Sequence, residues 1–361
     1  MSVSAIAGLY RDAHLTGKAG PSLPAAGSQR RQRLEFIDLL RAMAIIIVVA
    51  THMRDPFPPG GLIKSEPFGL LFRHINLIFI FVSGFLFQYL LGRFSYGSYL
   101  RTKLRNVGLP YLVMSLPALA IYLAGLKEPA PHVSAAAEYG ALGQLGVMLV
   151  TGSHLAPFWF IPMMAIFYFV APVLARMDRV PVFYWSILPL LAVSMVVGRS
   201  AADDNPAQNF LFYLPVYLIG MVMSHFAGRL TKVPALGWLA MMLCIFLPFW
   251  GPAAGDPFHD NFLFVTKIAF CIGLTGMLAL HVRKTPRWLR YVGDISFGIF
   301  FVHYYAIALV SLLVERQFFG GRLAGITLYL LSTAVVFGLS VLAVAVIRRL
   351  SGTHSRQIVG A

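Results

Sequence analysis

Charged residues are scarce in this 361-residue sequence, in which only 12% of positions are Asp, Glu, Lys or Arg. Soluble globular domains contain about 25% charged residues, because these side chains cover the surface that faces water. Apolar residues make up 58% of the sequence, and the mean hydropathy is +0.74. These values exclude an ordinary soluble domain and predict a protein that crosses a membrane several times.

Cysteine and acidic residues are also few. Cys244 and Cys271 lie within apolar runs without a zinc-like spacing of Cys and His, so no metal site is expected. The formal net charge is +15, but the basic residues fall mainly between apolar runs and near the ends of the chain. Membrane topology explains this charge better than nucleic acid. We expect membrane lipid around the chain and no nucleic-acid partner.

Long apolar runs define the predicted fold. A helix that spans a bilayer needs about 20 mostly apolar residues. We predict an all-α transmembrane bundle of about ten spanning helices, at residues 36–53, 68–91, 107–125, 157–175, 182–197, 209–227, 234–250, 262–279, 295–314 and 323–347. The shorter apolar segment 139–150 is predicted to be interfacial or re-entrant.

The domain organisation is simple. Residues 1–33 are rich in Gly, Ala, Ser and Pro and are predicted to form a disordered cytosolic tail. One transmembrane domain is expected over 34–349, followed by a short cytosolic tail over 350–361. With the N-terminus inside the cell, most of the 29 Lys and Arg fall in cytosolic segments. Both termini are therefore predicted to be cytosolic.

Ionisable residues in the first predicted helix are the clearest functional candidates, because such groups are costly inside a membrane. Asp38 and Arg41 lie near its cytosolic end and His52 near its outer end. Eleven residue steps lead from Arg41 to His52, which places them on one face about 16.5 Å apart along the axis. Asp38 can pair with Arg41 on that face. The alternative is that all three residues only anchor the helix at the two membrane surfaces.

Arg41 and His52, with ten residues between them, resemble the Arg/Lys-x10-His signature of the acyltransferase-3 family of bacterial membrane O-acyltransferases. The resemblance extends through further blocks in the family's order, namely IFVSGFL around Ser83, KLRNVGLPY over 103–111, FWFIP over 158–162 with Tyr168 and Pro172 after it, and ISFGIFFVH over 295–303. The family often has an Arg-x-x-Arg pair after the second helix, whereas this sequence has Arg101, Lys103 and Arg105.

The resemblance implies a membrane enzyme of about ten helices. Such an enzyme takes an acyl group, usually acetyl, from cytosolic acyl-CoA and transfers it to an extracytoplasmic glycan or a lipid-linked sugar. It also implies that Arg41 and His52 are functional residues, and it places the protein in the bacterial inner membrane. The acyl-CoA is a donor substrate, and the glycan or lipid-linked saccharide is the acceptor.

The transfer needs a base for the acceptor hydroxyl, and His52 is assigned that role because an imidazole with an ordinary pKa of about 6.5 can be neutral. Direct transfer and an acyl-histidine intermediate both remain open. Arg101, Lys103 and Arg105 are predicted to bind the CoA phosphates, with Arg41 deeper. Asp38, which can pair with Arg41, is assigned to the same cofactor-binding site. Ordinary enrichment of cations in cytosolic loops is the alternative explanation for this loop cluster.

Other polar residues are candidates for lining the path of the acyl group. These are His303, Ser83, Trp159 and Ser296. His303 could instead be a second proton carrier or a hydrogen-bonded residue between helices, and Ser83 favours close helix packing over a role as an oxyanion donor. Polar residues in the predicted outer segments could hold sugar hydroxyls, or they could simply be solvated: Asp55, Glu66, Asp203, Asp204, Asp256, His259 and Asp260.

Two further function classes compete with acyl transfer. A glycan exporter or flippase would also use a polar stripe inside the membrane, but no pair of helices suggests the inverted halves of a transporter. An accessory subunit without activity would not need Arg41 and His52. The spacing of those two residues favours the acyltransferase.

The predicted topology can be tested with single cysteines introduced into a cysteine-free parent. A membrane-impermeant thiol reagent added to intact cells should label Asp204→Cys and Asp256→Cys, because the loops that contain them are predicted to lie outside. It should not label Ser28→Cys in the cytosolic tail until the membrane is permeabilised. Labelling at position 28 but not at position 204 would reverse the topology.

Overall fold

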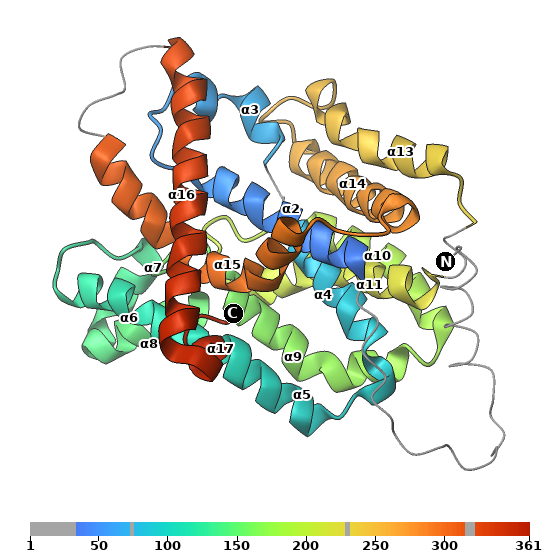
Figure 1. Cartoon of the computed structure of the whole chain (residues 1–361), viewed down its shortest axis with the longest axis horizontal. Helices are drawn as coiled ribbons and strands as arrows, with labels where there is room; N and C mark the ends of the chain where they lie inside the picture. Colours follow the sequence, from blue (N-terminus) through green and yellow to red (C-terminus); the bar gives the residue numbers. More distant parts are fainter. Residues whose placement is uncertain (1–33, 73–75, 228–231, 315–321) are drawn as a thin grey trace.

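The protein folds as a bundle of helices (Figure 1). A computed structural model describes residues 34–72, 76–227, 232–314 and 322–361, and these contain no β-strand. The predicted all-α class is therefore confirmed. The predicted tail over 1–33 lies outside the described residues.

The longer helices carry the labels of Figure 1. They are α2 (Glu35–His52), α4 (Leu77–Tyr89), α5 (Tyr96–Lys103), α6 (Leu109–Leu123), α8 (Gly140–Thr151), α9 (Phe160–Met177), α10 (Ile187–Val197), α11 (Pro206–His225), α13 (Ala235–Leu243), α14 (His259–His281), α15 (Arg287–Val314) and α16 (Arg322–Ser351). Shorter helical pieces connect them: η1 (Leu62–Lys64), α3 (Glu66–Leu70), η2 (Leu91–Arg93), η3 (Leu104–Gly108), α7 (Pro131–Ser134), η4 (Ala135–Tyr139), η5 (Pro181–Ser186), η6 (Cys244–Phe249), η7 (Gly352–His354) and α17 (Ser355–Ile358).

Each of the ten predicted apolar runs contains helix, although several boundaries differ. The run at 68–91 is divided, because α3 ends at Leu70 and α4 begins only at Leu77. The run at 107–125 begins earlier than predicted, because α5 continues into α6 through the π-helical turn η3. The segment 139–150, predicted to be interfacial or re-entrant, is largely the helix α8.

Six helical segments in the described parts of the chain are long and apolar enough to cross a membrane. They cover Tyr96–Leu123, Phe160–Met177, Pro206–His225, His259–His281, Arg287–Leu312 and Gly325–Ile358. The chain is therefore a multi-pass membrane protein, and the count of about ten spanning helices stays a prediction. Helix α2 is not among the six, because Glu35, Asp38 and Arg41 make its first two turns polar.

Helices α4 and α11 pack unusually closely, because glycines lie where they cross. A Cβ atom on Gly84 of α4 would lie 2.0 Å from the Tyr217 carbonyl oxygen of α11. A Cβ atom on Gly220 would lie 2.1 Å from the Phe81 carbonyl oxygen of α4. Only a residue without a side chain fits either position, so this crossing fixes α4 and α11 relative to each other.

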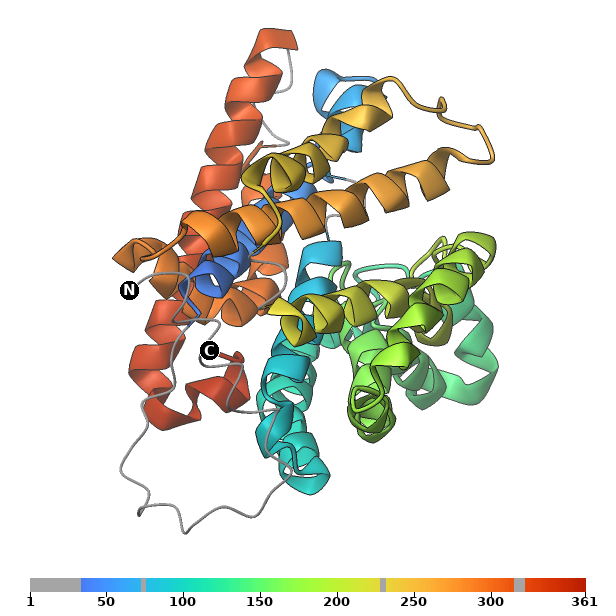
Figure 2. The same cartoon turned by 90° about the vertical axis from the view of Figure 1, so that its right-hand side faces the viewer.

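Helices α13 and α14 form a second closely packed pair, which Figure 2 shows away from α9. The Trp238 ring of α13 lies where a Cβ atom on Gly276 of α14 would be. Lys267 of α14 is buried, and its Nζ donates to the Leu70 carbonyl oxygen at 2.6 Å. This bond satisfies a carbonyl at the C-terminal end of α3 and ties α3 to α14.

The last residues of the sequence pack back on the bundle. Helix α16 extends to Ser351, so the predicted boundary at 349/350 falls within it. Helix α17 then packs on α6 and η3, and Val359 is fully buried. Ala361 lies against Gly298 of α15.

We expect Gly84→Ala to lower the thermal midpoint of the detergent-solubilised protein. The added methyl group must push α4 away from α11, and overpacking of this kind costs about 1–3 kcal/mol. Gly338→Ala is the matched control, because it lies inside α16 and a Cβ atom there would meet nothing within 4 Å. The control should leave the midpoint unchanged or raise it, since Ala favours helix more than Gly by about 1 kcal/mol. Equal midpoints for the two variants would contradict the close crossing.

Candidate active site

His52 lies at the C-terminal end of α2 in a cluster of aromatic rings. Its ring centroid is 5.4 Å from that of His303 and 5.8 Å from that of Tyr304, both on α15. The His52 side chain is half-buried, whereas His303 is fully buried at 0% exposure. The structure therefore brings together the two histidines that the sequence singled out on separate helices.

Hydrogen bonding defines which His303 nitrogen carries the proton. Nδ1 lies 2.8 Å from the Phe300 carbonyl oxygen and 3.1 Å from that of Ile299. Because a carbonyl oxygen only accepts, Nδ1 must be the donor. In the neutral ring Nε2 then has a lone pair, and it has no hydrogen-bond partner in the described parts of the chain. His303 thus offers an unused acceptor next to His52.

A pocket opens beside His52 where several helices meet. It holds about 290 Å³ of space that no atom fills, part of it open to solvent. Its lining comes from α2 (Val48 and His52), α4 with the residue before it (Asn76 and Phe79), the start of α9 (Pro157, Trp159 and Phe160) and α15 (Phe300). The predicted lining residue Trp159 is therefore beside His52.

Asp55 lies one turn beyond His52, where the chain has just left α2. The Asp55 Oδ2 atom is 3.4 Å from the Nδ1 atom of His52. A carboxylate accepts hydrogen bonds, so this contact favours the tautomer with the proton on Nδ1. The Nε2 nitrogen of His52 is then the one able to take a proton.

Arg41 contacts α15 at the opposite end of the site. Its Nη2 atom donates to the Ser296 hydroxyl of α15 at 3.1 Å, and Ser296 in turn donates to the Gly293 carbonyl oxygen. Lys103 at the end of α5 lies close enough for its charge to interact with that of Arg41. The Lys103 Nζ atom lies 4.9 Å from the centre of the Tyr168 ring. Arg41, Lys103 and Ser296 thus form one cationic cluster.

Arg101 and Arg105 do not belong to that cluster. Both are exposed and line a groove along α5 and η3 with Gly97, Leu100, Leu104 and Leu109. Arg105 also faces Gln357 of α17. The three basic residues predicted to act together therefore lie on two faces, with Lys103 directed inward and the two arginines on the surface.

Two other predicted residues lie beside the site rather than in the pocket. Asp38 is buried on α2 where α15 comes close, because a Cβ atom on Gly293 would lie 2.5 Å from the Asp38 carbonyl oxygen. The Ser83 hydroxyl donates to the Phe79 carbonyl oxygen at 2.7 Å within α4. Ser83 precedes Gly84 at the crossing with α11, which agrees with the packing interpretation.

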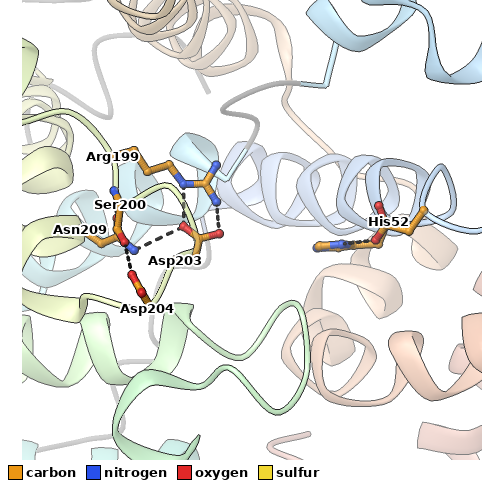
Figure 3. Close-up of polar contacts among 7 residues, drawn as sticks. His52, Arg199, Ser200, Asp203, Asp204 and Asn209 are labelled. Carbon is orange, nitrogen blue, oxygen red and sulfur yellow. Dashed lines mark hydrogen bonds and ion pairs between the residues drawn. The ribbon is translucent and has the colours of Figure 1, made fainter. Parts of the chain in front are cut away.

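A polar cluster in the loop between α10 and α11 lies near His52. Arg199 donates from Nε to Asp203 Oδ1 at 2.8 Å and from Nη2 to Oδ2, and the Asn209 amide also reaches Asp203. Figure 3 shows the His52 ring extending from α2 toward the side on which this cluster lies. Burial raises the pKa of Asp203 above its ordinary value, while the charges of Arg199 and His52 act in the opposite direction. The cluster and His52 therefore interact electrostatically.

The other predicted outer residues occupy separate positions. Asp204 accepts from the Ser200 hydroxyl at 2.6 Å and lies 3.6 Å from His132. His259 is 3.4 Å from Glu66, and Asp256 accepts from the Phe258 backbone before α14. Of the seven outer residues, Asp55 and Asp203 are the two that the structure relates directly to His52.

Sequence reasoning missed Asn76 and Arg199. Asn76 directly precedes the apolar residues of α4, a position where Asn usually caps a helix, and this signal was available. Arg199 lies between the predicted helices at 182–197 and 209–227. Its partner Asp203 lies four residues later in the same loop, so a local ion pair could have been expected.

The arrangement has the parts needed for proton transfer and anion binding. His52 has one nitrogen oriented by Asp55 and the other available to a substrate. Arg41, toward the other end of α2, and Lys103 at the end of α5 can hold an anionic group. The two functions lie at opposite ends of one helix.

Comparison with known proteins gives one match. A family model described as an acyltransferase domain matches residues 34–345, which include every residue of the pocket and of the cationic cluster. No curated protein and no solved structure matches the chain.

We expect Asp203→Ala to destabilise the protein, because it leaves the half-buried Arg199 guanidinium without its carboxylate. Hydrogen bonds to charged groups contribute about 1.5–3 kcal/mol, so the free energy of unfolding should fall by about that amount. Glu128→Ala, at an exposed carboxylate after α6, is the control and should change it by less than about 0.5 kcal/mol. Denaturation in detergent measures both. A loss for Glu128→Ala as large as that for Asp203→Ala would argue against the pair.

Proposed function

Because the chain belongs to the acyltransferase-3 family and is a membrane acyltransferase, we propose that it moves an acyl group from cytosolic acyl-CoA to a glycan hydroxyl. The acyl group is acetyl, and the acceptor is an extracytoplasmic or lipid-linked saccharide. The membrane is the bacterial inner membrane. The observation that carries the proposal is the position of a base and a cationic cluster at opposite ends of α2.

Arg41 and Lys103 are assigned to the donor. CoA carries several phosphates, and a guanidinium binds phosphate oxygens in pairs. The positive charges of Arg41 and Lys103 repel each other, so an anion that binds to both would relieve an unfavourable interaction. Arg101 and Arg105, in the groove on the surface of α5, are assigned to the entrance at the cytosolic surface.

His52 is assigned to the acceptor. Its Nε2 atom takes the proton of the acceptor hydroxyl while the hydroxyl oxygen attacks the carbonyl carbon of the thioester. The tetrahedral intermediate then collapses, the C–S bond breaks, and the CoA thiolate receives the proton from the His52 ring. The products are the ester and CoA with a free thiol.

Asp55 and His303 both lie next to the His52 ring and support this role. Asp55 accepts from Nδ1 and stabilises the imidazolium that forms during transfer. His303 has its own proton fixed on Nδ1 by the Phe300 carbonyl oxygen. Its Nε2 atom can accept a hydrogen bond from substrate or water beside His52. The Arg199–Asp203 pair is assigned to the sugar hydroxyls, because a carboxylate is a strong acceptor for them.

The proposal predicts that binding and transfer depend on different residues. Acetyl-CoA titrated calorimetrically into the purified protein should bind. Binding should weaken at higher salt, because salt screens the attraction between exposed charges, with a screening length of about 10 Å at 0.1 M ionic strength. Arg41→Ala should weaken binding about tenfold or more, since a charged hydrogen bond contributes about 1.5–3 kcal/mol. His52→Ala should bind normally. In inverted native membrane vesicles it should nevertheless transfer no labelled acetyl group to glycan.

Arg179→Ala provides the control, because it removes an exposed cation of the predicted cytosolic side without contact to Arg41. It should bind and transfer like the parent. A folded parent that binds a lipid-linked glycan but no acetyl-CoA would contradict the proposal and favour the exporter. Normal transfer by His52→Ala would remove the base from the mechanism.

A further inference from the structure

Two long helices begin at the pocket beside His52. Asn76 directly precedes α4, and Trp159 directly precedes α9; both residues line the pocket. The first N–H groups of a helix have no partner within it, and the helix dipole places partial positive charge there. Neither α4 nor α9 has an acidic residue in its first turn. The positive potential of both helix starts is therefore not neutralised locally.

Asn76 precedes the first residue of α4 but does not cap the helix with its side chain. Asn is among the best residues for capping a helix, because its side chain accepts from the first backbone N–H groups. Here the Asn76 side chain makes no capping bond, and it lines the pocket instead. Its amide therefore remains available as a donor at the start of α4.

Trp159 is held rigidly by its neighbours. Its ring stacks on Tyr213 with centroids 5.9 Å apart, and the Arg199 guanidinium lies 4.9 Å from the ring centre. Only 4% of Trp159 is exposed, and its indole nitrogen has no hydrogen-bond partner in the described parts of the chain. An N–H that is fixed in place and otherwise unused can donate to a substrate without reorganisation.

We propose that the Asn76 amide and the Trp159 indole N–H form an oxyanion site opposite His52, reinforced by the N-termini of α4 and α9. This inference rests on the proposed function. When the acceptor oxygen attacks the thioester, the carbonyl π electrons move to the carbonyl oxygen, which becomes negative. The two donors stabilise that oxygen until the C–S bond breaks and the carbonyl re-forms. His52 carries the acceptor's proton to the CoA thiolate.

The Ser83 hydroxyl is not the donor in this site. It already donates to the Phe79 carbonyl oxygen within α4 and is not part of the pocket lining. His303 is not the donor either, because its proton is directed at the Phe300 carbonyl oxygen. Asn76 and Trp159 are thus the neutral donors that the pocket offers to a developing negative charge.

The test uses inverted native membrane vesicles in which the chromosomal copy is replaced by each variant, with labelled acetyl-CoA as the donor. Trp159→Phe keeps the aromatic ring and removes the N–H, and Asn76→Asp keeps the shape and removes the donor. Each should lower the maximal rate per protein molecule about 10²–10³-fold, the usual effect of losing one such donor. For Trp159→Phe, the KM for acetyl-CoA and the pH at half-maximal rate should stay within about twofold and 0.5 unit of the parent, because donor binding and His52 are untouched. Asn76→Asp also adds a carboxylate to the pocket that His52 lines, so for this variant only the KM is expected to stay within about twofold.

Trp238→Phe is the matched control. Trp238 is equally buried, at 3% exposure, and its indole nitrogen also has no partner in the described chain, but it packs against α14 outside the pocket. The control should transfer at the parent rate. A comparable loss in Trp238→Phe would attribute the effect to packing and overturn the oxyanion site.

The outcomes separate this inference from the proposed function. If Trp159→Phe and Asn76→Asp both keep rates within threefold of the parent while His52→Ala is inactive, the oxyanion site is wrong and the acyl transfer stands. If the parent protein transfers no labelled acetyl group, the proposed acyl transfer itself is wrong, and the oxyanion site is wrong with it. Immunoblotting of the vesicles normalises each rate to the amount of inserted protein.

Discussion

The contact between α2 and α15 is the interaction on which the site depends. At one end, Gly293 lets the α15 backbone approach the Asp38 carbonyl, and Ser296 holds Arg41. At the other end, the His303 ring lies next to that of His52. Because both contacts are made by the same two rigid helices, the spacing between cation and base follows from helix geometry, at about 1.5 Å per residue. No loop contributes to that spacing.

Burial explains why so many polar groups in the bundle are paired. An unpaired charge in an apolar interior costs several kcal/mol, so most such groups find a partner. Lys267 donates to backbone carbonyls at the end of α3, and Asp178 accepts from His225. The Trp159 indole N–H and the Asn76 amide, which line the pocket, are exceptions to this pairing, as is the Trp238 indole N–H outside it. A substrate gains the most binding free energy by forming hydrogen bonds with polar groups that are otherwise unpaired inside the protein.

Much of this architecture could be predicted from local periodicity in the sequence. Contacts between distant segments could not be predicted in this way. Apolar runs located the helices, and 3.6-residue geometry placed Arg41 and His52 on one face. The same geometry would have separated Lys103 from Arg101 and Arg105, because residues two apart point in opposite directions and residues four apart share a face. The break between α3 and α4 had a local signal, because Arg73, His74 and Asn76 interrupt the apolar run there. The approach of the α10–α11 loop to His52 joins residues about 150 positions apart, which no local pattern encodes.

The glycine crossing of α4 and α11 has a consequence for how the enzyme could change during evolution. Asn76 stands at the start of α4, and the loop with Arg199 and Asp203 leads into α11. Since the crossing fixes α4 relative to α11, Asn76 and this loop are held in a fixed relative position. If the loop binds the acceptor as proposed, replacing residues in it would change the acceptor without moving Asn76. Relatives that differ in acceptor should vary most between α10 and α11 and least at Gly84 and Gly220.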